Sequence, residues 1–323
     1  IDVFVIGEGE VTINKFLDIY LENKNLDNFL DMDGIYIPKF NNNAKIALID
    51  DMKNAYHITQ PIITKTDKED YKTVFSDSIM LNVSRGCTRG CRFCMSSYLY
   101  RPLRETTIKE LVNIALKTRE NTNLNKITLI GAAVGDYYDL EGLTKALESE
   151  GFQIATPSLR IDSLSRETLE TLKKSGLKSI TIAPESISTL RERINKSISD
   201  EKIFSVIKNA VDLDFNIKLY FLIGIPYESK EDIEELANYI EKIANMHKNR
   251  NYIKFSINPV IPKPQTPLQW EVYNFKEIKS KTRYLKKKLR KYNVKFESPK
   301  KGLIQYILSC GNREVGAVIE KSL

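Results

Sequence analysis

From residue 79 onwards, short apolar runs alternate with longer segments whose apolar residues recur at helical spacing. The runs predict six strands, at 79–83, 127–130, 152–155, 179–183, 217–223 and 252–257. The intervening segments predict helices at about 106–120, 139–149, 165–176, 188–195, 200–213, 230–247 and 276–291. Continuous apolar strands that alternate with helices are typical of parallel sheets, so the pattern predicts an α/β fold shaped as a partial (β/α)6 barrel.

Two of these helices carry end signals. Thr107 followed by Glu110 has the spacing of a capping box, in which each side chain caps the other residue's backbone N–H group. Ser165 opens a later helix in a similar way, and Gly176 closes it, because glycine readily adopts the left-handed conformation that ends helices.

The segments on either side of this alternation look different. An apolar strand at 2–7 leads into a helix whose apolar positions are Phe16, Leu17, Ile19 and Tyr20. We therefore expect three parts: an N-terminal α/β remnant with a linker (1–75), a core (76–275) and a basic helical C-terminal extension (276–323). The chain begins with Ile1 rather than Met, and we expect its N-terminal part to be missing from this sequence.

The composition, with 42% hydrophobic and 28% charged residues, is that of a water-soluble globular protein. No apolar run is long enough to cross a bilayer, and the start shows no secretory signal. We expect a cytoplasmic protein without membrane insertion.

The net charge of +7 is concentrated in one segment. Residues 276–301 hold twelve Lys or Arg and only two acidic residues. Within it, Ile278, Leu285, Leu289 and Tyr292 have near-heptad spacing, so one side is expected to pack on the core. The lysines then either face water or bind RNA phosphates.

Three of the four cysteines, Cys87, Cys91 and Cys94, follow the first core strand within eight residues. Three thiolates at this spacing can hold three irons of a [4Fe–4S] cluster and leave the fourth iron open to a ligand. Clustered cysteines also suggest a reducing compartment rather than disulfides. A structural zinc site remains the alternative, but it usually takes four ligands. The other candidate ligands are remote in sequence: His57, His247 and Cys310.

This loop, SRGCTRGCRFCM at residues 84–95, resembles the signature of the radical S-adenosylmethionine (SAM) enzymes, with Phe93 at the family's aromatic position. The resemblance implies that SAM binds the open iron and is cleaved reductively to a 5′-deoxyadenosyl radical, which abstracts hydrogen from a substrate. It also implies a TIM-like (β/α)6 barrel, an anaerobic setting and a low-potential electron donor such as flavodoxin or ferredoxin.

Further motifs resemble one radical SAM group that often follows a cobalamin-binding domain. They are PSLRIDS, APES, INKSISDE, LYFLIGIP and PKPQTPLQW. The VIGEGE stretch at 5–10 resembles the end of such a cobalamin domain, although any strand–turn–helix of a doubly wound sheet has the same pattern. The resemblance implies cobalamin in the full-length protein and C-methylation of a peptide or metabolite. Modification of RNA and a non-catalytic zinc or iron–sulfur module remain alternatives.

Active sites of α/β barrels gather at the carboxyl ends of the strands. We expect the residues there to contact SAM, and the candidates are Gly131, Asp136, Ser158, Arg160, Glu185 and Gly224, although the stretch from Gly131 to Asp136 departs from the family's glycine-glycine-glutamate pattern. Asp136 is the candidate acceptor for the amino group, and Arg160 the candidate partner of the carboxylate. The alternatives are that Gly131 only permits a tight turn and that Arg160 forms a surface ion pair with Asp162.

Several other residues have two interpretations each. Trp270 either stacks on the substrate or packs, and Cys310 is expected to be a buried thiol rather than a ligand. Five arginines near the cysteines either attract an anionic substrate or acidic electron donor, or are solvated or ion-paired. They are Arg85, Arg89, Arg92, Arg101 and Arg104.

Overall fold

The computed structural model describes residues 1–322 except 64, 65, 67, 73, 74, 76, 157 and 250. The chain divides into two compact units, Ile1–Thr59 and Gln60–Leu323. The expected boundary at residue 76, Pro157 of the PSLRIDS motif and the last residue, Leu323, lie outside the described residues. None of the described helices is both long and apolar enough to span a membrane.

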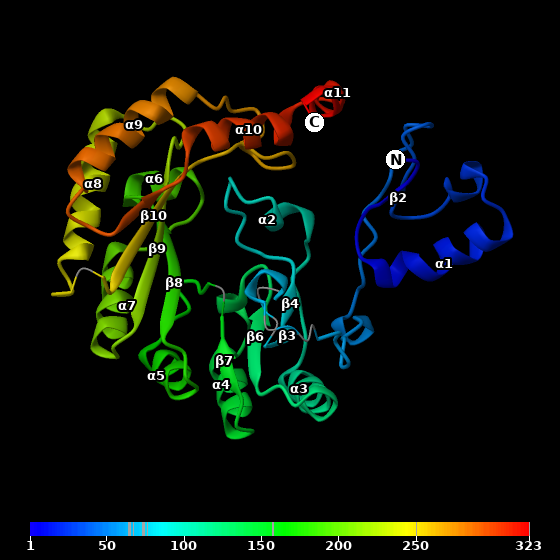
Figure 1. Ribbon diagram of the computed structural model, residues 1–323, viewed down its shortest axis with the longest axis horizontal. Helices are drawn as coiled ribbons and strands as arrows, with labels where there is room; N and C mark the ends of the chain where they lie inside the picture. Colours follow the sequence, from blue (N-terminus) through cyan, green and yellow to red (C-terminus); the bar gives the residue numbers. More distant parts are fainter. Residues whose placement is uncertain are drawn as a thin grey trace. The chain divides into compact units, whose positions relative to one another are not determined.

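The second unit is built on parallel strands in two sheets (Figure 1). One sheet has the order β3-β6-β7, with β3 at Ile79–Asn82, β6 at Lys126–Ile130 and β7 at Gln153–Ala155. The other has the order β8-β9-β10-β11, with β8 at Ser179–Glu185, β9 at Asn216–Ile223, β10 at Ile253–Pro259 and β11 at Val294–Phe296. All six expected strands form, and the α/β partial-barrel prediction is confirmed.

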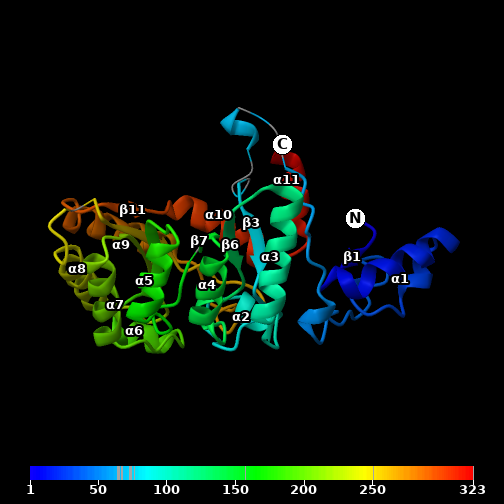
Figure 2. The same cartoon turned by 90° about the horizontal axis from the view of Figure 1, so that it is seen from below.

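Helices connect these strands. They are α3 (Ile108–Thr122), α4 (Leu140–Ser149), α5 (Arg166–Lys174), α6 (Ser188–Arg193), α7 (Asp200–Asp212), α8 (Lys230–Ala244) and α9 (Phe275–Lys288). Figure 2 shows α3, α4 and α5 side by side along the outside of the strands. The capping box of Thr107 and Glu110 is confirmed, and Ser165 Oγ accepts a hydrogen bond from the Thr168 N–H (2.9 Å).

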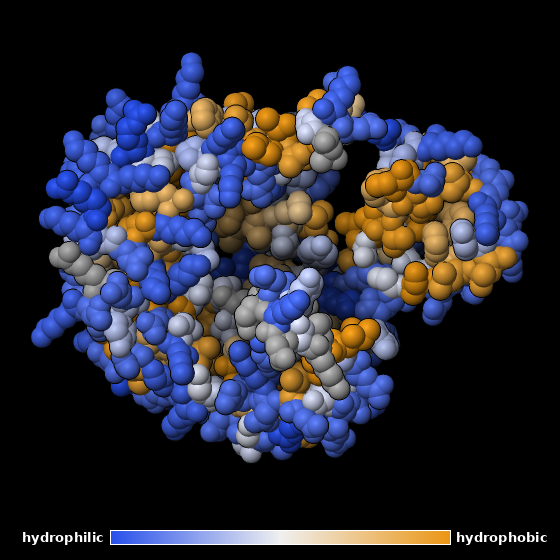
Figure 3. Space-filling view, viewed as in Figure 1, coloured by the Kyte–Doolittle hydropathy of each residue, from blue (hydrophilic) through white to orange (hydrophobic). Residues whose placement is uncertain are grey.

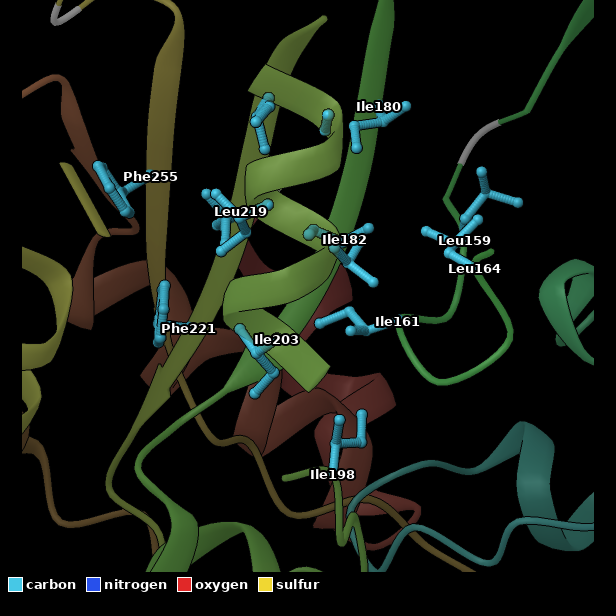
Figure 4. Close-up of a cluster of buried hydrophobic side chains, with 14 of the residues drawn as sticks. Leu159, Ile161, Leu164, Ile180, Ile182, Ile198, Ile203, Leu219, Phe221 and Phe255 are labelled. Atoms are coloured by element: carbon cyan, nitrogen blue, oxygen red, sulfur yellow. The ribbon is translucent and has the colours of Figure 1, made fainter. Parts of the chain in front are cut away.

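The core continues across the gap between β7 and β8. The Leu159 N–H donates to the Thr181 carbonyl (2.9 Å), so the segment after β7 lies against β8. Figure 4 shows Ile161 pointing toward Ile182 of β8, and both side chains are buried in one cluster with Phe221. Burying such a side chain contributes about 1.5–3 kcal/mol, so apolar packing joins the two sheets.

The expected helical extension contains a strand. Three residues, Val294–Phe296, form β11, which pairs in parallel with β10 at the edge of the sheet. Two helices follow, α10 (Pro299–Cys310) and α11 (Glu314–Ser322). In the basic segment, Ile278, Leu285 and Leu289 are buried, as their spacing predicts.

The expectation of a buried Cys310 is wrong, because the residue is exposed. It ends α10, where the neighbouring apolar residues Ile304, Ile307 and Leu308 are exposed as well. A run of apolar letters therefore does not bury the thiol here. Its Sγ donates to the Pro262 carbonyl (3.3 Å).

In the first unit, β1 (Phe4–Val5) pairs antiparallel with β2 (Ile35–Tyr36), and α1 spans Gly9–Glu22. Its core contains Phe29, against which Phe16 packs, whereas Leu17 and Tyr20 are exposed. Figure 3 shows hydrophobic residues gathered on the visible face of this unit. Short 3-10 helices complete the chain: Leu26–Phe29, Met52–Asn54, Glu69–Tyr71 and Val134–Asp136.

Candidate functional site

The three clustered cysteines lie on a loop between β4 (Ser84–Arg85) and α2 (Ser96–Leu99). Strand β4 pairs antiparallel with β5 (Arg104–Glu105), so the loop returns close to its start. Gly86 has φ +86°, and a Cβ there would lie 2.3 Å from the Pro102 carbonyl oxygen. Glycine is therefore needed for this close approach of the backbone.

A turn after α6 holds the same loop from the other side. The Arg92 N–H donates to the Ile194 carbonyl (2.9 Å), and Asn195 Nδ2 donates to the Gly90 carbonyl (3.0 Å). The Tyr98 hydroxyl donates to the same carbonyl (2.8 Å). The cysteine loop is thus held both by Tyr98 within the loop region and by Ile194 and Asn195, which lie more than a hundred residues further along the chain.

One cavity of about 210 Å³ collects most of the expected site residues. Its wall combines the cysteine loop with the carboxyl ends of β6, β7 and β8, as the strand-end rule predicts. The expected residues that line it are Cys87, Cys91, Cys94, Phe93, Gly131, Ser158, Arg160 and Glu185. Asp136 and Gly224 do not line this cavity, and their roles stay predictions.

The donor set suits an iron–sulfur cluster, which takes its protein ligands from cysteine thiolates. All three thiols are free, with Cys87 and Cys91 buried and Cys94 partly buried. Within the described part of the chain, no three His, Cys, Asp or Glu side chains converge on one ion position, as a zinc site requires. In a cubic cluster, each cysteine thiolate binds a different iron.

Two cations lie close to Cys91. Burial raises the pKa of the Cys91 thiol, while the positive charges of Lys196 and Arg160 act in the opposite direction. These cations suit thiolate ligands, because they offset negative charge that burial would otherwise destabilise.

Arg160 belongs to a network of two arginines and two aspartates. It contacts Asp162 through Nε and Nη2 (3.0 and 2.9 Å) and lies 3.3 Å from Asp136. Arg89 contacts both Asp136 oxygens (2.9 and 2.7 Å). The ion pair between Arg160 and Asp162 therefore forms, but it is not the surface pair considered in the sequence analysis, because the Arg160 side chain is only 16% exposed.

The network also sets the charge of Asp162. Burial alone would raise the pKa of this carboxyl group, but hydrogen bonding to Arg160 and the charges of both arginines outweigh burial and lower it. Asp162 is therefore held ionised beside the cavity.

Glu185 and Lys196 form a second pair, with 2.7 Å between carboxylate and ammonium. Both side chains are about nine-tenths buried. Glu185 has φ +69° after an irregularity in β8, a strained conformation for a non-glycine residue that often marks functional positions. The sequence prediction missed Lys196, although the INKSISDE motif contains it.

Arg191 is fully buried and was also missed. Its guanidinium donates to the Ser186 carbonyl and to Asp200, which also accepts from the Tyr239 hydroxyl (3.0 Å). Arg191 thus ties together Ser186 and Asp200, the two ends of the segment that contains Lys196.

Gly224 lies in a different cavity, of about 870 Å³, together with Trp270. Its φ is +78°, and its N–H donates to Glu228 Oε2 (2.7 Å). Trp270 is 86% exposed, so it does not pack. Among the arginines near the cysteines, Arg104 is buried, whereas Arg92 is exposed.

A family model described as the Radical SAM superfamily matches residues 81–240. The uncharacterized protein MJ0966 of Methanocaldococcus jannaschii is 34% identical over 99% of the chain, which covers 69% of that relative. The uncharacterized methyltransferase PH0819 of Pyrococcus horikoshii is 24% identical over 84% of the chain and 58% of its own length. A tRNA-2-methylthio-N(6)-dimethylallyladenosine synthase of Ehrlichia canis is 24% identical over 76% of the chain and 58% of its own length.

Two solved structures share the fold. The radical SAM methyltransferase TsrM from Kitasatospora setae, with tryptophan substrate and a SAM analogue, has a TM-score of 0.60 at 10% identity, over 84% of this chain and 54% of TsrM. The cobalamin-dependent SAM radical enzyme OxsB, with aqua-cobalamin bound, has a TM-score of 0.55 at 15% identity, over 87% of this chain and 45% of OxsB. The chain thus spans about half of each.

The matched region begins within β3, contains the cysteine loop and supplies the carboxyl ends of β6, β7 and β8 that surround it. The chain belongs to the radical SAM superfamily, whose members are enzymes that use a [4Fe–4S] cluster and SAM.

Proposed function

We propose that Cys87, Cys91 and Cys94 hold a [4Fe–4S] cluster whose open iron binds SAM. When bound, this pair of cofactors supplies a 5′-deoxyadenosyl radical that abstracts hydrogen from a substrate. One observation carries the proposal. The three free cysteines line the same cavity as the cations Arg160 and Lys196, at the carboxyl ends of β6, β7 and β8.

The chain's own residues would bind and position the two cofactors. The cysteines bind the irons, and Arg160 and Lys196 offset the negative charge of the thiolates. The Arg160 guanidinium is oriented by Asp162 and lines the cavity, where it can meet a carboxylate of SAM. Because Asp136 is engaged by Arg89, a role toward the SAM amino group requires this ion pair to open.

The experiment is anaerobic reconstitution with iron and sulfide, reduction, and addition of SAM. The proposal expects 5′-deoxyadenosine and methionine in equal amounts. Zinc without iron in the purified protein, or a reduced cluster that leaves SAM intact, contradicts it. The physiological electron source in this proposal is a low-potential protein such as flavodoxin or ferredoxin, for which the exposed Arg92 offers a positive charge beside the cysteines.

We further propose that the full-length protein uses cobalamin for C-methylation. The support is a methyltransferase relative and the shared fold with a cobalamin-bound enzyme. Residues 1–75 are the candidate tail of a cobalamin-binding domain plus a linker, and exposed apolar residues on α1 suit packing against further structure. Bound cobalamin and transfer of a labelled methyl group from SAM test this step, and the absence of either contradicts it.

RNA modification is the second candidate, favoured by the tRNA-modifying relative and by exposed lysines on α9. Salt-dependent tRNA binding that is lost when Lys286 and Lys287 are changed to Glu supports it. Two other lysines of this helix already have carboxylate partners, since Lys281 pairs with Glu228 and Lys288 with Glu234. Retained binding in the double variant argues against this candidate.

A further inference from the structure

A second cavity adjoins the cysteine site. It measures about 330 Å³ and is lined by the ends of β9 and β10, the residue after β11, and α10. Phe93, beside the third cysteine, lines both cavities. A molecule in the second cavity would therefore lie next to whatever the cysteine cavity holds.

Two opposite charges face this cavity without neutralising each other. Lys263 and Glu297 both line it, and among the described residues no ion pair within 4.0 Å includes either one. Lys263 Nζ donates to the Ser309 hydroxyl (2.9 Å), a neutral partner. Burial lowers the pKa of Lys263, so its charged form lacks sufficient compensation.

Glu297 lies directly before Ser298, the N-cap of α10. The cavity thus presents one cation and one anion, and both are only partly exposed.

The remaining lining sets size and polarity. Asn258 and Gln305 bring amide groups, while Leu222 and Phe93 bring apolar surface. The Asn258 oxygen accepts from Ser256 (3.4 Å), which leaves its amide nitrogen for a ligand. The volume is at the lower end of the range for small-molecule sites, which is about 300–1,000 Å³.

We infer that this cavity binds a free α-amino acid with an apolar or aromatic side chain, as the substrate of the proposed radical chemistry. Lys263 receives the carboxylate and Glu297 the ammonium group. A nucleotide phosphate is repelled by Glu297 and a simple amine by Lys263, so the pair discriminates against ligands with one charge. The inference rests on the proposed function, because it assigns the substrate of that reaction.

The first test is calorimetric titration of the anaerobically reconstituted protein with L-leucine, L-phenylalanine and L-tryptophan. Each is compared with its N-acetyl and its carboxamide derivative. We expect at least one free amino acid to bind and both of its derivatives to bind at least tenfold more weakly. No binding by any of the three, or equal binding by the derivatives, overturns the inference.

The second test reverses the charges. Lys263→Glu and Glu297→Lys should each weaken binding at least tenfold, and the double variant should recover most of it, because a zwitterion can bind in the opposite orientation. Lys295→Glu, an exposed residue on β11 outside the cavity, is the matched control and should bind like the wild type. Single reversals without effect contradict the assignment. If a variant fails to fold, the derivative series on the wild type still decides.

The two proposals fail separately. Cleavage of SAM by the wild-type protein decides the proposed function, and the titrations decide the substrate class. A protein that cleaves SAM but binds derivatives as well as free amino acids retains its proposed chemistry and loses this inference.

Discussion

The two halves of the strand-end face use their charges differently. Around the cysteines, charged side chains neutralise one another, as in the Arg160–Asp162 and Lys196–Glu185 pairs. At the ends of β10 and β11, Lys263 and Glu297 face a cavity without a charged partner among the described residues. Internal pairs fix side chains before a ligand arrives, whereas unpaired charges gain their partners from the ligand. Under the two proposals above, this difference would separate a preformed cofactor side from a substrate side whose charges the ligand completes.

Removing a cysteine should break the cofactor side completely. In Cys91→Ala we expect loss of the iron and of SAM cleavage to below detection, because two ligands cannot retain the cluster in place of three. Folding should persist, because the apolar cluster that forms the core does not include Cys91. Iron analysis and circular dichroism measure both. The exposed Cys310→Ala is the control and should keep its iron; full iron in Cys91→Ala refutes the ligand assignment.

Lys196→Met tests whether the cofactor side depends on its internal pairs. The change leaves a buried Glu185 carboxylate unpaired and should destabilise the protein without cluster by about 3–5 kcal/mol. The double variant with Glu185→Gln should recover most of this loss. Lys263→Met, which breaks no ion pair among the described residues, should cost less than about 1 kcal/mol. Urea unfolding measures all three, and equal losses for Lys196 and Lys263 erase the contrast between the two sides.

Gly224→Ala tests how tightly α9 packs, through Ile278, against the end of β9. Alanine there adopts a left-handed conformation at a cost of about 1–2 kcal/mol and places a Cβ 2.3 Å from Ile278 Cδ1. Gly176→Ala is the matched control, because its φ is +93° but nothing lies within 4 Å. We expect Gly224→Ala to lose about 1 kcal/mol more in urea unfolding, from overpacking. Equal losses of stability in the two variants would mean that the Ile278 side chain can move aside without cost.

The smallest effect concerns pH. Burial raises the pKa of Glu228, and the charge of Lys281 opposes the shift without cancelling it. The folded state therefore holds this proton more tightly than the unfolded state, so stability falls as pH rises from the unfolded pKa of about 4.3 through the folded value. Glu228→Gln should flatten this part of the stability–pH profile, which unfolding at several pH values measures. An unchanged slope removes Glu228 as its source.

Much of the fold was predictable because it follows from local pattern. Apolar runs separated by amphipathic segments place β3, β6 to β10 and α3 to α9, and a capping pair places the start of α3. The short edge strand β11 was not predictable, since a charged residue between two apolar ones carries little signal. The antiparallel pairing of β1 with β2 depends on a contact about thirty residues away, which a local pattern does not contain.

The site divides along the same line. The cysteine loop and most strand-end residues were predictable, because motif spacing and the parallel-sheet rule locate them. Lys196 and Arg191 were not, because their importance arises when the chain returns to the cavity after β8. The same holds for Lys263 and Glu297, which are 34 residues apart and line one cavity only in the folded chain.

The central claim is a cluster with one iron open to SAM. Mössbauer spectroscopy of the reconstituted protein, recorded with and without SAM, tests it most directly. We predict four irons per chain, one of which changes its signal when SAM is added while the other three do not. Four equivalent irons that ignore SAM, or no bound iron at all, would contradict the claim.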